Sequence, residues 1–172
     1  MRNKNVTMIT QGAIIAALYV VLTMIANAMG LSNYAIQVRF SEALCILPFF
    51  TVAAIPGLTV GCLIANIMTG ALVWDVLFGS IATLIGAIGT YLLRKHKVLM
   101  FLPPILANMI IVPFVLRYGY GFTWMFHDVE WSIPYFALTV GIGEIISVGI
   151  LGSVLLKALL PYKTMLKIWK EE

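Results

Sequence analysis

The basic residues of this chain gather in three clusters, and long apolar stretches separate the clusters. Nine of the eleven lie there: Arg2 and Lys4, then Arg94, Lys95 and Lys97, and finally Lys157, Lys163, Lys167 and Lys170. Cytoplasmic loops of membrane proteins are enriched in Lys and Arg. Placing all three clusters inside requires an even number of spans between consecutive clusters. The pattern therefore predicts a multi-pass membrane protein whose N- and C-termini are cytoplasmic.

The composition agrees with a chain that is covered by lipid. Hydrophobic residues make up 62% of the 172 residues, charged residues make up 10%, and the mean hydropathy is +1.02. Soluble domains carry roughly 25% charged residues. The length is that of one domain, so we expect residues 1–172 to form a single transmembrane domain. The net charge of +4 comes from the three clusters, which does not indicate a nucleic-acid partner.

Six apolar segments fit this topology, and we expect each to be a transmembrane helix in a compact all-α bundle. They cover residues 8–28, 41–55, 58–73, 76–93, 98–116 and 134–160. The first begins like a signal peptide but is longer than the apolar region of one, so we expect it to be retained. Pro56-Gly57 predicts a tight cytoplasmic turn after the short second segment. Trp74-Asp75 predicts an outer hinge, and three prolines predict a kink in the fifth segment.

Sequence motifs for enzymatic chemistry are missing. The chain has no GxxxxGK[ST] loop, no HExxH, no GxSxG and no Cys/His cluster with metal-binding spacing. We therefore expect a protein that is not an enzyme, that needs no cofactor or metal, and that cannot hydrolyse ATP by itself.

Polar residues inside apolar segments are costly in hydrocarbon and are therefore candidates for function. Glu144 is the strongest case, because it lies ten residues beyond Pro134, or about 15 Å along a helix. A charge at that depth costs about 2.5–3.5 kcal/mol on insertion scales. Glu144 should therefore face a ligand, water or a partner, and a structural pair with Arg39 or Arg117 is the alternative.

Carboxylates from three helices can converge near the outer ends of the bundle. Together with nearby amides, an arginine and aromatic rings they form the predicted substrate-binding set: Glu42, Asp75, Glu144, Asn66, Arg39, Asn108, Trp74 and Trp124. Carboxylates accept hydrogen bonds from the N–H groups of a flat heterocycle, and aromatic rings stack on its face. A rim ion pair between Arg39 and Glu42, interhelical hydrogen bonds of the two amides and interfacial tryptophans remain alternatives.

Small residues form a stripe on the first helix. Gly12, Ala13, Ala16 and Ala17 make two small-xxx-small pairs, which allow close approach of another helix. The stripe predicts either packing within the bundle or docking of a separate membrane partner.

Several runs resemble the QueT family. They are IQVRFSEAL at 36–44, PFF at 48–50, AAIPG at 53–57, GCLIAN at 61–66, WDVLFGS at 74–80 and Gly143-Glu144. The resemblance implies a substrate-binding S-component of an energy-coupling factor (ECF) importer in the bacterial cytoplasmic membrane. It implies capture of a queuosine precursor of the 7-deazaguanine class, preQ1 or queuine, from outside. It also implies a T-component, contacted by Ala13 and Ala17, two ABC ATPases, and delivery by toppling of the whole subunit.

Other readings predict different behaviour. An S-component for another vitamin, such as thiamine or riboflavin, would keep the architecture and change the ligand. A structural or channel subunit would bind no ligand saturably. An intramembrane enzyme has only the carboxylate group in its favour.

Overall fold

The structure is a computed structural model that describes residues 4–31 and 37–162. Arg2, Lys163, Lys167 and Lys170, which belong to the predicted cytoplasmic clusters, lie outside the described residues. The α-helices are α1 (Lys4–Ala28), α2 (Ala54–Met68), α3 (Val73–Leu92), α4 (Leu102–Phe114), α5 (Ser132–Glu144) and α6 (Gly152–Leu159). The 3₁₀-helices are η1 (Phe40–Phe49), η2 (Leu99–Phe101) and η5 (Leu160–Tyr162), and the π-helices are η3 (Val115–Gly119) and η4 (Ile145–Leu151).

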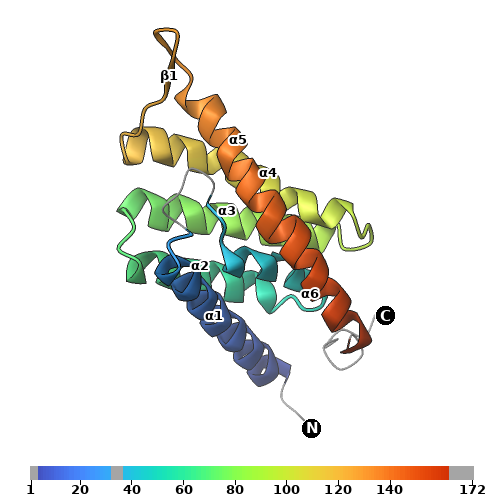
Figure 1. The fold of residues 1–172 in the computed structure, drawn as a ribbon. Coiled ribbons are helices and arrows are strands. Elements are labelled where there is room, and N and C mark those ends of the chain that lie inside the picture. Colours follow the sequence, from blue (N-terminus) through green and yellow to red (C-terminus); the bar gives the residue numbers. More distant parts are fainter. Residues whose placement is uncertain (1–3, 32–36, 163–172) are drawn as a thin grey trace.

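Helices that follow one another in the sequence lie side by side. The packed pairs are α1 with α2, α2 with α3, α3 with α4, and α4 with α5. In Figure 1, α5 and α6 form one long diagonal helix that runs down toward the same end of the molecule as the start of α1. The 3₁₀-helix η1 packs against α1, α3, α6 and η4. It is therefore the central element that joins the first part of the chain to the last.

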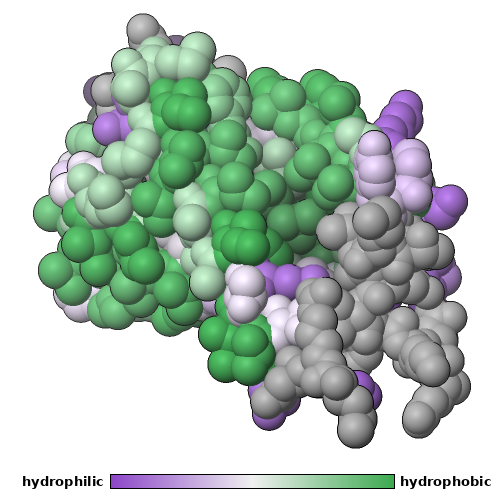
Figure 2. All heavy atoms as spheres, turned by 90° about the horizontal axis from the view of Figure 1, so that it is seen from below, coloured by the Kyte–Doolittle hydropathy of each residue, from purple (hydrophilic) through white to green (hydrophobic). Residues whose placement is uncertain are grey.

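The helices are long and apolar enough for a membrane protein. Four candidate spans are found among the described residues: Lys4–Ala28, Val73–Leu92, Leu99–Gly119 and Ser132–Tyr162. Figure 2 shows a wide area of apolar residues on the outer surface. Phe40–Phe49 and Ala54–Met68 are shorter apolar helices, so the count of six spans and the orientation of the termini stay predictions.

The boundaries predicted around the second segment were wrong. Residues 41–55 do not form one helix, because the 3₁₀-helix ends at Phe49 and the chain turns before α2 begins at Ala54. Pro56-Gly57, predicted to be a turn, lies in the first turn of α2. A proline is tolerated there because the first N–H groups of a helix have no partner within it.

The predicted outer hinge was also misplaced. Trp74 and Asp75 lie in the first turn of α3, and the turn precedes them between Thr69 and Leu72. Gly70 adopts a φ of 71° in this turn, a left-handed conformation that glycine adopts more readily than other residues.

The proline-rich fifth segment remains helical throughout. Pro103 and Pro104 occupy the first positions of α4, where their missing N–H groups cost nothing. Pro113 lies near its end and is followed directly by the π-helix η3. The irregularity expected from the prolines thus takes the form of a change in helix type.

A small β-hairpin departs from the all-α prediction. Strands β1 (Met125–Phe126) and β2 (Val129–Glu130) pair antiparallel, and the hairpin projects beyond the helices at the top of Figure 1. His127 and Asp128 join the strands with φ of 49° and 60°. Positive φ at both central residues suits a two-residue hairpin turn.

Candidate ligand-binding site

A polar cavity of about 540 Å³ lies at the end of the bundle where α2 ends and α3 begins. Its walls come from α1, the segment before η1, the end of α2, the α2–α3 turn, the start of α3, α4, η3, the segment after η3, and α5. The lining residues are Thr23, Ala26, Asn27, Gln37, Arg39, Asn66, Thr69, Gly70, Ala71, Asp75, Val112, Leu116, Tyr120, Phe122, Tyr135, Phe136, Thr139 and Val140.

Asp75 is the carboxylate that lines this cavity. It is buried in the first turn of α3, where its side chain accepts a hydrogen bond from the Tyr120 hydroxyl at 3.2 Å. The Tyr120 oxygen in turn accepts from the backbone N–H of Leu72 at 3.3 Å. Asn66 donates from its side-chain amide to the backbone carbonyl of Asp75 at 3.4 Å. These contacts hold the carboxylate at the cavity wall.

The phenol of Tyr120 stays in its neutral form. Partial burial raises the pKa of the Tyr120 hydroxyl, and the neighbouring Asp75 carboxylate raises it further. The hydroxyl therefore remains a donor that keeps Asp75 in place at neutral pH.

Arg39 provides the positive charge of the cavity. Its backbone N–H donates to the Ser147 hydroxyl of η4 at 3.1 Å, and its charge interacts with the carboxylates of Asp75 and Glu42. Among residues 4–31 and 37–162, the Arg39 guanidinium forms no hydrogen bond or ion pair. The alternative of a rim ion pair with Glu42 is not what the structure contains.

Aromatic rings form one side of the cavity. Tyr120 and Phe122 stack with their centroids 5.6 Å apart, and Tyr135 meets Phe136 edge-on at 5.6 Å. Trp124 stacks on Tyr135 with centroids 4.6 Å apart. Trp124 therefore contacts a lining residue, Tyr135, but does not line the cavity itself.

Glu42 lies away from the cavity surface, in the core of the bundle. It is only 2% exposed, and it accepts hydrogen bonds from the Tyr19 hydroxyl of α1 and, at 3.1 Å, from the Cys45 thiol. Both carboxylate oxygens therefore have partners. The residue is part of the buried polar core and does not line the cavity.

Glu144 is also buried, but one of its oxygens is unpaired. Asn108 of α4 donates to Oε1 at 2.9 Å, and Oε2 has no hydrogen-bond partner among the described residues. The alternative pairing with Arg117 is excluded, because Arg117 forms an ion pair with Glu130 of the hairpin. Glu144 and Asn108 do not line the cavity, whereas Val112 and Val140, one turn away on the same helices, do.

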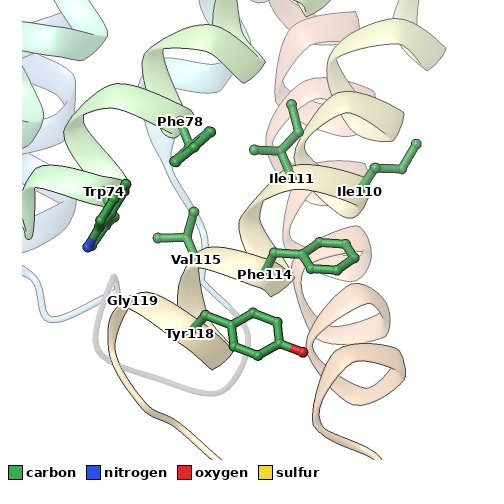
Figure 3. Close-up of a pocket in the computed structure, with 8 residues that line it drawn as sticks. All are labelled: Trp74, Phe78, Ile110, Ile111, Phe114, Val115, Tyr118 and Gly119. Atoms are coloured by element: carbon green, nitrogen blue, oxygen red, sulfur yellow. The ribbon is translucent and has the colours of Figure 1, made fainter.

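Trp74 lies at a different cavity. That space is apolar, has a volume of about 500 Å³, and lies open to the outside between α3 on one side and α4 and η3 on the other. Figure 3 shows its lining side chains, among them Trp74, Phe78, Val115 and Tyr118. Trp74 is 57% exposed and turns toward this apolar space.

The predicted substrate-binding set thus divides into three groups. Arg39, Asn66 and Asp75 line the polar cavity, and Trp74 and Trp124 lie outside it. The buried group is Glu42, Asn108 and Glu144. Sequence reasoning missed Tyr135 and Gln37 as lining residues, although Tyr135 lies in the predicted segment 134–160 and Gln37 lies in the run IQVRFSEAL at 36–44.

The small residues of α1 divide between two faces. A side chain at Gly57 would meet the carbonyl oxygen of Gly12 at 2.7 Å, and one at Gly61 would meet the Cα of Ala16 at 3.0 Å. Gly12 and Ala16 therefore pack against α2, as the alternative of packing within the bundle predicts, and the docking of a partner on the stripe stays a prediction. Ala13 and Ala17 are exposed.

A curated relative and a family model both relate this chain to QueT proteins. A protein named "Queuosine precursor transporter QueT" from Lactococcus lactis subsp. cremoris (strain MG1363) is 40% identical over 86 residues, which are 49% of this chain and 50% of that protein. The alignment thus spans about half the length of the relative. No solved structure matches the chain. The model of the QueT transporter family matches residues 9–161. Because that match covers most of the chain, this multi-pass membrane protein belongs to the QueT transporter family.

Proposed function

We propose that the protein is the substrate-binding membrane subunit, or S-component, of an ECF-type importer for a queuosine precursor. Membership of the QueT family and the name of the Lactococcus relative support the substrate class. The observation that carries the proposal is the polar cavity, which a carboxylate, an arginine without an ion pair among the described residues, and several aromatic side chains line together. Its volume of about 540 Å³ lies in the range of small-molecule sites.

The lining residues suit the hydrogen-bonding edge of a 7-deazaguanine. In the proposed complex, Asp75 accepts hydrogen bonds from the ring N–H and the exocyclic amine. Arg39 donates to the ring carbonyl oxygen. The rings of Tyr120 and Tyr135 lie along the wall on which the flat heterocycle would stack.

The energy for uptake would come from other chains. The sequence contains no P-loop, as expected of a subunit that relies on two partner ATPases and a T-component. Ala13 and Ala17 form the small, exposed surface on α1 at which we place the T-component. In this scheme the whole subunit topples within the membrane to deliver its ligand.

Isothermal titration of the purified, solitary protein in detergent tests the proposal. The panel is preQ1, queuine, guanine, thiamine and riboflavin. Saturable binding of a 7-deazaguanine, with guanine much weaker, is the expected result. Binding of thiamine or riboflavin instead would overturn the substrate. No binding by a protein shown to be folded would favour a structural or channel subunit.

A further inference from the structure

A short segment that is neither helix nor strand, residues 37–39, lies directly before η1. Gln37 and Arg39 of this segment both line the polar cavity. The N–H of Val38 between them donates to the carbonyl oxygen of Leu31 at 3.3 Å. Because the segment lacks the repeating hydrogen bonds of a helix or a strand, its backbone groups need partners elsewhere. Its position therefore depends on the elements that it touches.

Two contacts place this segment against the long helix that α5 and η4 form together. The backbone N–H of Arg39 donates to the hydroxyl of the buried Ser147 at 3.1 Å. One helical turn earlier, Gly143 leaves no room for a side chain. A Cβ at that position would overlap the carbonyl oxygen of Gln37 and would lie 3.1 Å from its carbonyl carbon. The backbone of the segment therefore rests directly on the backbone of α5.

The obstacle at Gly143 is backbone, which cannot rotate aside. Gly141 on the same helix gives the contrast, because a Cβ there would meet the sulfur of Met109 at 2.8 Å, and a methionine side chain is flexible enough to move. Extra atoms in a tight contact force a shift of the backbone. A methyl group at residue 143 would therefore push the segment away from α5, and Gln37 and Arg39 would move with it.

Building on the proposed function, we propose that Gly143 and Ser147 are positioning residues for the ligand, which set the place of Gln37 and Arg39 in the cavity wall. Gly143 and Ser147 do not line the cavity themselves, so they act through the segment. Gly143 sets how closely the segment approaches α5, and Ser147 sets its register along the helix. In the proposed complex, this places the Arg39 guanidinium for donation to the ring carbonyl oxygen.

Isothermal titration of the full-length protein in detergent with preQ1 and queuine tests this inference, because it measures the Kd and the stoichiometry separately. Gly143→Ala should weaken binding roughly tenfold or more, as expected when a hydrogen bond from a charged group is misplaced, and should keep the wild-type stoichiometry. Ser147→Ala removes the anchoring acceptor without adding bulk, and should weaken binding about twofold to tenfold. Gly149→Ala is the matched control on the same helix, since its Cβ would meet its nearest neighbour at 3.8 Å. It should keep the wild-type Kd.

The stoichiometry distinguishes positioning from a purely structural role. If Gly143 only allowed the helices to pack, Gly143→Ala would lower the fraction of protein that binds and leave the Kd of that fraction unchanged. This result would overturn the inference, as would an equal rise of the Kd in Gly149→Ala. If Gly143→Ala does not fold, Ser147→Ala decides. A wild-type Kd in folded Ser147→Ala would then overturn the inference, and weaker binding at full stoichiometry would support it.

The inference and the proposed function fail in different ways. Tight binding by the wild-type protein, with the same Kd in both folded variants, would remove the positioning role and leave the substrate class intact. If the folded wild-type protein binds neither preQ1 nor queuine, the proposed function fails and the inference fails with it.

Discussion

At the scale of single residues, Asp75 is the group through which the cavity would recognise hydrogen-bond donors. Its position depends on the first turn of α3 and on the Tyr120 hydroxyl. Hydrogen bonds to a charged partner contribute about 1.5–3 kcal/mol, whereas neutral ones contribute about 0.5–1.5 kcal/mol. The carboxylate should therefore matter more for binding than the phenol that orients it.

Asp75→Asn is expected to weaken binding of a 7-deazaguanine by more than tenfold, because it replaces an ionised acceptor with a neutral amide. Tyr120→Phe removes only the orienting donor and should cost less, about twofold to tenfold. Titration calorimetry of both variants measures the difference. Wild-type affinity in folded Asp75→Asn would remove Asp75 from the site.

The ion pair between Arg117 and Glu130 predicts a transition in acid. The hydrogen bond from Arg117 holds the pKa of Glu130 below its ordinary value of 4.5. A lowered pKa in the folded state means that the pair stabilises the hairpin above the ordinary value, and that this stabilisation is lost as the pH falls through the lowered one. The fluorescence of the neighbouring Trp124 and Trp131 should change in that range. Glu130→Gln should lack the transition, and its persistence there would assign it to another group.

At the scale of elements, the contact between α1 and α2 is a backbone contact made possible by glycine. Gly57 lies against the carbonyl oxygen of Gly12, and Gly61 lies against Ala16 and the Cβ of Tyr19. Tyr19 extends from this seam to the Glu42 carboxylate. Separation of the two helices would therefore also disturb the buried polar group.

Gly57→Ala is expected to lower the thermal unfolding midpoint in detergent, because the added Cβ would lie 2.7 Å from a backbone oxygen that cannot move aside. Overpacking of this kind costs about 1–3 kcal/mol. Gly149→Ala is the matched control, since its Cβ would meet its nearest neighbour at 3.8 Å, an ordinary contact. Equal midpoints for the two variants would contradict the close approach of α1 and α2.

The sequence predicted elements well where one long apolar run became one helix. Residues 76–93 correspond closely to Val73–Leu92, and residues 134–160 to the combined span Ser132–Tyr162. It failed at Pro56-Gly57, because the same dipeptide suits a turn and the first turn of a helix. The hairpin was missed because His127-Asp128 lacks the glycine that usually marks such a turn.

The candidate site was only partly predictable from the sequence, because the sequence marks the charged residues but does not show which of them reach the cavity. Glu42, Asp75 and Glu144 stand out because they are charged residues near or within apolar runs. Which of them reaches the cavity depends on the rotation and depth of each helix, and these are set by packing with the others. Asp75 lines the cavity, while Glu42 and Glu144 do not.

At the scale of the whole molecule, the exposed pair on α1 is the surface we assign to the T-component. Ala13→Leu with Ala17→Leu should leave ligand binding by the solitary protein unchanged, because both side chains face outward. In cells that contain the T-component and the ATPases, uptake of the ligand should fall at least tenfold, since the larger side chains prevent close helix approach. Val21→Leu, at another exposed position of α1, is the control. Normal uptake by the double variant would place the partner elsewhere.

The order of packing has a consequence for how the molecule assembles. Helices α1 to α5 each contact the next one in the sequence, so these contacts can form progressively as the chain is synthesised. The cavity cannot form in this way, because α5 supplies Tyr135 and Thr139 and the Arg39 backbone is held by Ser147. A nascent chain that ends before α5 should therefore insert and pack its first helices yet remain unable to hold a ligand. If the cavity binds the ligand as proposed, binding requires that α5 and η4 have packed against the earlier helices.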